Sequence, residues 1–209
     1  HKVGRATTVR TAGAGIYLLR GEQSVYVCTN DLSLSSLLEQ ARRAAELLDG
    51  GTGSLQVPPL VVRQIVSPNP VEISPGDVDN ARKIALLRDV SGSTAGYKGL
   101  RSLGIGYSDK DQRVMIANTE GLYTEDRRTA CRLRMRATVE GNDGKLLSRW
   151  QDYVQPFGFE GMRDTGEATA FAKDFLDRMA VSLKAEPIRS CTVPVVLEAG
   201  SCGTFWHEC

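Results

Sequence analysis

Hydrophobic and polar positions alternate most regularly between residues 131 and 140. Apolar residues occupy the odd positions of this stretch, and polar residues occupy the even ones. The odd set is Cys131, Leu133, Met135, Ala137 and Val139, and the even set is Arg132, Arg134, Arg136, Thr138 and Glu140. Because successive side chains of a β-strand point to opposite faces, the pattern predicts a strand with one buried and one solvated face. A sheet with one wet face is typical of antiparallel pairing.

Further strands are predicted on both sides of this one. Apolar residues on either side of a polar turn at 20–23 predict a hairpin over residues 16–28. Residues 55–73 carry four prolines and no clear period, so they are predicted to be an extended crossing segment. The remaining turns are predicted at the polar or glycine-rich positions 109–112, 118–121 and 141–144, with a strand over 145–153 after the last of them.

Three helices are predicted from apolar residues at helical spacing. The first spans about 33–49 and begins at a serine cap, Ser33 or Ser35. The second spans about 74–90, because a serine, a proline and an acid together form a helix-start signal there. The third spans about 165–184. The apolar faces consist of Val78, Ala81, Ala85 and Leu86 in the second helix and of Phe171, Phe175, Met179 and Leu183 in the third.

The end of the chain predicts one more strand and the beginning of a helix. A β-branched apolar run covers residues 193–197, a glycine-containing turn follows, and residues 204–209 can begin a helix. A helix this short needs packing partners, so we expect it to be weakly anchored, with Phe205 and Trp206 exposed. Together the elements predict an α+β protein, an antiparallel sheet with helices packed on one side.

Composition narrows the class of protein. The 209 residues are 41% hydrophobic, which is enough for a substantial core, and 26 basic residues balance 25 acidic ones. This balance gives no net field toward nucleic acids or membranes, and no apolar run is long enough to cross a bilayer. The sequence shows no signal peptide, and its five cysteines have no CxxC spacing. Free thiols in a reducing cytoplasm are the interpretation that these features favour.

The arginines of the even-numbered face are the strongest candidates for nucleic-acid binding. No aromatic residue interleaves with them in the sequence, although a surface that stacks single-stranded bases would require this. A solvated face or a contact with another domain is therefore the favoured interpretation, and we expect no nucleic-acid partner. The arginines of this face are Arg132, Arg134 and Arg136, and Arg127 and Arg128 precede them in the sequence.

His207 and Glu208 form the only adjacent histidine–carboxylate pair, and the only other histidine is His1. An imidazole is a common zinc ligand, and a neighbouring glutamate on the same helix can act as general base toward a water molecule. The spacing alone fits an ordinary helix start without metal equally well. The pair is therefore a candidate site that needs support from its context.

The cysteines are a weaker source of metal ligands. Cys209 lies two residues after His207, roughly 200° around a helix with 3.6 residues per turn, so it points away from the imidazole. We expect Cys191, Cys202 and Cys209 to be small buried residues. Cys28 and Cys131 fall in predicted strands and are expected to be core thiols.

Three stretches of the chain resemble the TldD/PmbA family. Residues 194–209 read PVVLEAGSCGTFWHEC, similar to the strand, glycine turn and helix in which that family carries its HExxxH motif. Residues 13–33 resemble the family's GVGVR…TNDLS pattern, and residues 107–122 resemble its YSD…ANSEG pattern. The three matches follow the family's order, so the resemblance covers nearly the whole chain.

The resemblance implies a zinc metallopeptidase in which His207 is a zinc ligand and Glu208 is the general base. It implies cytoplasmic hydrolysis of peptides or unfolded protein segments within a homodimer or a heterodimer of TldD/PmbA-family subunits. Residues 1–189 would form an N-terminal α+β domain, and residues 190–209 would begin the C-terminal metallopeptidase domain. The second histidine of the motif would lie beyond Cys209, so the chain would hold one zinc ligand of three and be inactive alone.

One alternative from another functional class stays open. The chain could act only by binding, as the non-catalytic dimerisation module of a PmbA/TldE-like subunit. The presence of His207 and Glu208 favours the catalytic branch of the family. The family's older description as modulators of DNA gyrase does not change the expectation for nucleic acids.

Overall fold

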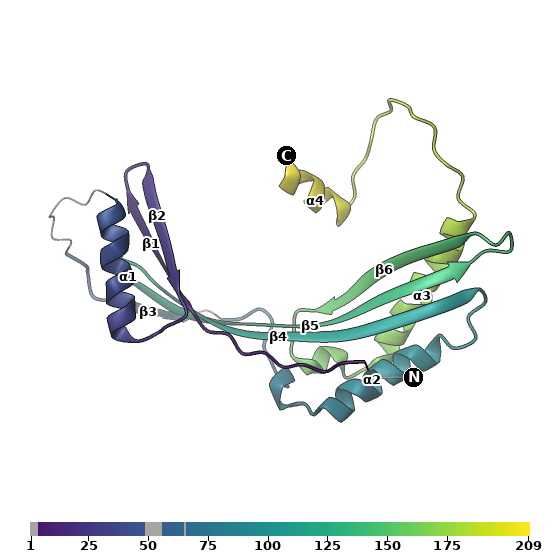
Figure 1. Cartoon of the computed structure of the whole chain (residues 1–209), viewed down its shortest axis with the longest axis horizontal. Coiled ribbons are helices and arrows are strands. Elements are labelled where there is room, and N and C mark those ends of the chain that lie inside the picture. The colour runs from purple at the N-terminus through teal and green to yellow at the C-terminus, as the bar shows by residue number, and fades with distance from the viewer. Residues whose placement is uncertain (1–3, 49–55, 65) are drawn as a thin grey trace. The chain divides into compact units, whose positions relative to one another are not determined.

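The computed structural model of the chain describes residues 4–48, 56–64 and 66–209 (Figure 1). They form two compact units, each assembled from three stretches of the sequence. The first unit consists of His1–Arg88, Tyr107–Arg132 and Val154–Asp164, and the second of Asp89–Gly106, Leu133–Tyr153 and Thr165–Cys209. Helices and sheets occur together in the chain, so the predicted α+β class is confirmed.

The first unit begins with the predicted hairpin. Strands β1 (Ala14–Arg20) and β2 (Gln23–Thr29) pair antiparallel, with Ala14 opposite Thr29. Helix α1 (Leu34–Leu47) follows and contacts both strands (Figure 1). Ser33 is the N-cap, because its side chain accepts a hydrogen bond from the Ser36 N–H. The hairpin and the capped helix are both confirmed.

A single long strand, β5 (Leu122–Glu140), organises the rest of the sheet. It pairs with β4 (Leu100–Ala117), with β6 (Leu146–Gln155) and, in parallel, with the short strand β3 (Val61–Gln64). The turns predicted at 118–121 and 141–144 are confirmed. Gly121 and Gly144 have φ angles of 85° and 79° there, in the left-handed region that favours glycine.

The turn predicted at 109–112 is wrong, because β4 continues through these residues as strand. The acidic side chains of these residues form ion pairs while their backbone stays in the strand. The Lys83 ammonium lies 2.7 Å from Asp109, and Arg127 forms a two-pronged ion pair with Asp111. Polar residues that resemble a turn in the sequence are therefore accommodated on an extended strand.

The start of the second predicted helix is also wrong. Residues Pro75–Asp77 form only a 3-10 turn, and α2 runs from Asn80 to Ser93. Val78 separates the two with an extended backbone and a buried side chain, and the Asp79 carboxylate accepts the Arg82 N–H at 2.8 Å. The buried side of α2 is correspondingly shifted: Leu86 and Val90 are buried, whereas Ala81 and Ala85 are exposed.

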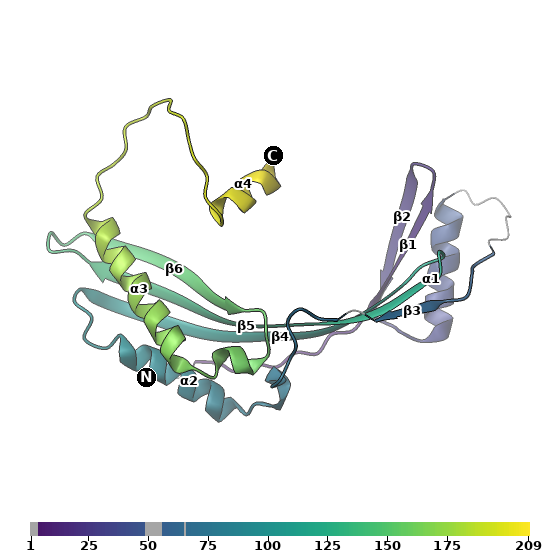
Figure 2. The same cartoon turned by 180° about the vertical axis from the view of Figure 1, so that it is seen from behind.

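The alternation between residues 131 and 140 buries one face of the strand, as predicted. Every odd-numbered residue from Cys131 to Val139 is buried, with at most 1% of its surface exposed, and Arg134 and Arg136 are exposed. In the second unit, α3 (Thr165–Leu183) supplies the other side of this core through Ala168, Ala172, Phe175, Leu176 and Met179. Figure 2 shows α3 crossing β5 and β6. Phe171 and Leu183 are only partly buried.

Contacts between α3 and β6 fix the helix on one face of the strands. The Tyr153 ring lies 5.2 Å from the Phe171 ring, and its hydroxyl donates to Glu167 at 2.9 Å. Tyr153 lies on the odd-numbered face, whereas Arg134 pairs with Asp152 on the even-numbered face. In the second unit, helix and arginines thus occupy opposite faces of the sheet.

The strand predicted at 193–197 does not form in the part of the chain that the structure describes. These residues have no regular structure, and Val195 and Val196 are 72% and 92% exposed. A strand without a pairing partner leaves its backbone groups to water and is not stable alone. The chain ends in helix α4 (Ser201–Glu208), preceded by Gly200 at a φ of 107°.

Candidate functional site

The two candidate catalytic residues lie next to each other at the end of α4. His207 and Glu208 are both exposed, so each side chain is available to a ligand or to water. Consecutive residues of a helix point about 100° apart, so the imidazole and the carboxylate diverge. Phe205 and Trp206 on the same helix are 50% and 67% exposed, as predicted, and their rings meet edge to face at 5.6 Å.

The described residues contain no group of three or more histidine, cysteine or acidic side chains that could hold a metal ion. Zinc sites in proteins use three or four protein ligands. His207 has the chemistry of one such ligand, and Glu208 has that of a general base. The described part of the chain therefore contains at most a fraction of a zinc site.

The cysteines differ from the sequence prediction in their burial. Cys131 is buried as expected, but Cys28, Cys191 and Cys209 are exposed and Cys202 is half-buried. Cys191 is exposed because the segment before α4, in which it lies, forms no strand. All five are free thiols in the structure.

Cys131 is unsuited to nucleophilic chemistry despite a polar neighbour. The Tyr107 hydroxyl donates a hydrogen bond to its sulfur at 3.3 Å. Burial raises the pKa of Cys131, because an apolar environment disfavours the thiolate. The Cys131 thiol is therefore a core residue, protonated and inaccessible.

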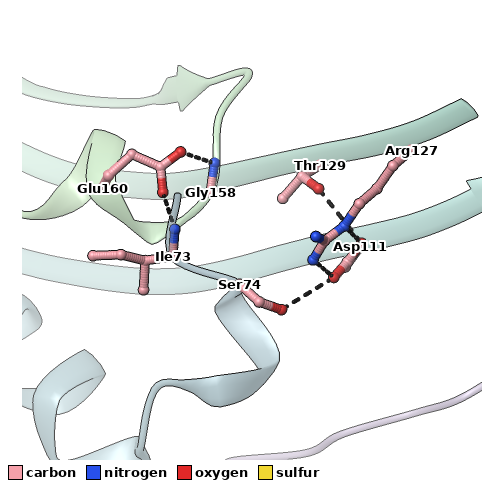
Figure 3. Close-up of polar contacts among 7 residues, drawn as sticks. All are labelled: Ile73, Ser74, Asp111, Arg127, Thr129, Gly158 and Glu160. Carbon is pink, nitrogen blue, oxygen red and sulfur yellow. Dashed lines mark hydrogen bonds and ion pairs between the residues drawn. The ribbon is translucent and has the colours of Figure 1, made fainter. Parts of the chain in front are cut away.

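A polar cluster in the first unit was not predicted from the sequence (Figure 3). Its centre is Asp111 on β4, which accepts bonds from Arg127 at 2.9 and 2.6 Å. Ser74 and Thr129 donate to the same carboxylate at 3.2 and 3.4 Å. The hydrogen bonds from Arg127 lower the pKa of Asp111, so this side chain stays ionised.

A second carboxylate, Glu160, joins two loops of the same unit (Figure 3). It accepts the backbone N–H of Ile73 at 2.8 Å and that of Gly158 at 2.7 Å. Burial raises the pKa of Glu160, but the backbone hydrogen bonds outweigh this effect and the pKa is lowered overall. Each oxygen has a partner already, so Glu160 holds backbone in place and is not a candidate acid or base.

An aromatic residue lies next to the arginines in the second unit, although none interleaves with them in the sequence. Trp150 comes from the neighbouring strand β6, and the Arg134 guanidinium stacks over its ring at 4.6 Å. Asp152 holds the same guanidinium with two bonds of 2.8 Å each. Because the ion pair neutralises Arg134, the pair of residues offers little charge to a phosphate backbone.

None of the helices within residues 4–48, 56–64 and 66–209 has the length and apolar character needed to span a bilayer.

The described residues form an α+β protein, and sequence comparison identifies its family. A sequence model of the PmbA/TldA metallopeptidase central domain matches residues 73–186, more than half of the chain. The chain belongs to the TldD/PmbA family. The matched region contains β4, β5, β6, α2 and α3, and it ends before His207.

Known proteins of this kind are similar over most of the chain. The metalloprotease TldD homolog of Haemophilus influenzae is 27% identical over 208 residues, covering 94% of this chain and 42% of its own length. A crystal structure of a Bacteroides thetaiotaomicron protein named as a candidate modulator of DNA gyrase superposes with a TM-score of 0.59. It covers 80% of this chain and 39% of its own, and its 15% identity supports the shared fold alone. The chain thus spans less than half the length of either relative.

Proposed function

We propose that the chain is the N-terminal portion of a zinc-dependent metallopeptidase that hydrolyses peptides or unfolded protein segments. The observation that carries the proposal is the family match over residues 73–186, combined with a histidine–glutamate pair on the following helix. The similarity to a protein named metalloprotease TldD homolog supports the same reaction class. Under this proposal, residues 1–189 form the N-terminal domain and residues 190–209 begin the catalytic domain.

The proposed roles of the two residues follow from their chemistry. The neutral imidazole of His207 is a ligand that zinc prefers. Zinc, when bound, polarises the scissile carbonyl and acidifies water. Glu208 has no hydrogen-bond partner among the described residues, so its carboxylate is free to accept a proton from water and to return it to the leaving amine. The described residues do not complete the ligand set, and the remaining ligands are proposed to come from outside this chain.

Assembly and location belong to the same proposal. We infer that the protein works as a homodimer or a heterodimer with another TldD/PmbA-family subunit, in the cytoplasm. Exposed apolar side chains on α4 and on the segment before it support an association, because such surface is unfavourable in water. Five free cysteines support a reducing compartment.

A non-catalytic subunit is the alternative that one observation favours. The matched family region ends at residue 186 and includes neither His207 nor Glu208. The chain could then act by binding a partner or a peptide, as a PmbA/TldE-like subunit would. Zinc content and activity of the full-length protein distinguish the two functions.

The decisive experiment compares full-length protein, extended beyond Cys209 from its gene, with its Glu208→Gln variant. The proposal expects stoichiometric zinc in both proteins and peptide hydrolysis only in the first. Loss of a positioned general base lowers turnover about 100-fold to 10,000-fold. Near-normal turnover by the variant would exclude Glu208 as the base. Full-length protein without zinc and without activity would favour the non-catalytic subunit.

A further inference from the structure

A cavity of about 580 Å³ lies within the second unit, at the end of its sheet and of α3. Three segments line it: the loop before β4, the end of β5 with the turn after it, and the last turn of α3. The lining residues are Tyr97, Lys98, Val139, Glu140, Asp143 and Leu183, together with their immediate neighbours. A volume between about 300 and 1,000 Å³ is typical of pockets for small ligands.

Fixed contacts hold the walls of this cavity in place. The Glu140 N–H donates to the Gly99 carbonyl at 2.8 Å, and the Glu140 carboxylate forms an ion pair with Arg101. Gly99 has a φ of 82°, and a Cβ atom there would come within 2.5 Å of the Glu140 carbonyl oxygen. The loop and the strand end therefore approach as closely as a glycine permits. A wall fixed in this way loses little entropy when a ligand binds.

Tyr97 forms one side of the cavity and is anchored from α3. Its hydroxyl donates to Asp177 at 2.8 Å. Burial and this carboxylate raise the pKa of Tyr97 to about 12, so the phenol stays protonated and keeps the bond. The ring is thereby held as an apolar surface. The half-buried side chains of Ala180 and Leu183 extend this surface.

Some charged groups around the cavity have partners within the chain, and others do not. Glu140 pairs with Arg101, and Asp143 accepts the Lys145 N–H at 3.1 Å. Lys98 and Lys184 are exposed, and neither ammonium group forms an ion pair or a hydrogen bond with any of the described residues. A lysine ammonium can only donate hydrogen bonds, so these two hydrated groups are available to an acceptor on a ligand. A carboxylate is the acceptor that also matches their charge.

We propose that this cavity binds a carboxylate joined to an apolar side chain. The apolar group would lie on Tyr97, Ala180 and Leu183, and the carboxylate would meet Lys98 and Lys184. This combination occurs at the carboxyl terminus of a peptide that ends in an apolar residue, and also in a small free acid such as an N-acylated leucine. The site is distinct from His207 and Glu208, and it does not depend on their proposed roles.

Titration of the 209-residue protein followed by amide NMR tests the ligand chemistry. N-acetyl-leucine should shift the signals of residues 97–98, 139–143 and 180–184. N-acetyl-leucinamide has the same apolar group without the charge and should bind about tenfold more weakly, since it loses charge-assisted bonds. The tripeptide Gly-Gly-Leu distinguishes the two sources: tighter binding than N-acetyl-leucine indicates a peptide terminus, and weaker binding indicates a free acid. Equal affinity for acid and amide, or no saturable shifts with the acid, would overturn the proposal.

Substitutions of the lining residues test whether the compounds bind in this cavity. The double variant Lys98→Gln, Lys184→Gln should lose at least about tenfold in affinity for the acid and leave amide affinity unchanged. Lys173→Gln is the matched control, because Lys173 is an exposed lysine of α3 that does not line the cavity. Ala180→Phe should fill the cavity and abolish binding of both compounds, with thermal unfolding as the check that it still folds. Wild-type affinity in the double variant would overturn the proposal even if Ala180→Phe failed to fold.

Discussion

The role of each acidic side chain in this chain depends on what its oxygens contact. Arginine, hydroxyl and backbone donors already occupy the oxygens of Asp111 and Glu160. Glu208 is exposed and has no partner among the described residues, which leaves its oxygens available. At the scale of residues, the two carboxylates with partners are therefore structural, and Glu208 is the candidate for chemistry.

Asp111 should make stability depend on pH. Its folded-state pKa is lowered by Arg127, below the unfolded value of about 3.9. Its contribution is therefore fully present above that value and is lost as the pH falls through the folded pKa. Asp111→Asn should reduce the free energy of unfolding by about 1 kcal/mol at pH 7. Urea unfolding at pH 7 and at pH 3 measures this, and an unchanged difference at pH 3 would contradict the assignment.

Leu133 and Arg134 are neighbours in sequence on opposite faces of β5, and they should respond differently to truncation. Leu133 is fully buried, so Leu133→Ala should cost about 2–5 kcal/mol through lost burial and a residual cavity. The Arg134 side chain is 48% exposed, so Arg134→Ala should cost no more than about 1 kcal/mol despite its ion pair with Asp152. Urea unfolding of both variants provides the test. Equal, large losses would mean that another element covers the arginine face.

At the scale of elements, local pattern predicts those segments whose partners are nearby in sequence. The hairpin over β1 and β2, the capped helix α1 and the alternation in β5 follow from period and turn chemistry alone. The turn expected at 109–112 does not form, since its acids pair with residues of α2 and β5 that no local window contains. The strand β3 escaped prediction, because its four residues depend on a parallel partner far away in the sequence.

The strand expected at 193–197 is the opposite case, because the sequence predicts an element that does not form. Its β-branched residues have high strand propensity, but propensity of this kind reflects packing on a sheet surface and not the backbone itself. Within the described residues no strand pairs with this segment, and its side chains stay exposed. The candidate site is limited in the same way: the sequence names His207 and Glu208, but a ligand set converges from separate segments and cannot be located from one of them.

Helix α4 should be the least protected helix in hydrogen exchange. It has eight residues, Gly200 contributes no side-chain cap, and most of its side chains are exposed. Helices shorter than about 12 residues are marginal in water unless they pack. In dilute protein we expect amides 204–208 to exchange at nearly unprotected rates, whereas amides near Phe175 and Leu176 in α3 should be strongly protected. Slow exchange across α4 would show that it packs stably without further partners.

At the scale of the whole molecule, the sheet region and the candidate residues His207 and Glu208 lie in different parts of the chain. The family match covers β4, β5 and β6, and the Haemophilus influenzae relative extends well beyond the part that this chain matches. The odd-numbered residues from Cys131 to Val139 are buried, whereas His207 and Glu208 lie on an exposed helix. Folding and metal binding should therefore be separable properties of this chain.

Zinc content tests that separation directly. Stable zinc binding needs three or four protein ligands, and the described residues contain no group of three. The 209-residue protein, purified without a histidine tag and dialysed against excess zinc and then buffer, should retain well below one zinc ion per chain by elemental analysis. His207→Ala should show the same low content and an unchanged unfolding midpoint, because a single exposed imidazole contributes little to either. Stoichiometric zinc that survives a chelator in both proteins would point to a site built from cysteines, among them the exposed Cys191 and Cys209. Stoichiometric zinc that His207→Ala removes would instead mean that this chain brings further ligands to His207, for example by association of two chains.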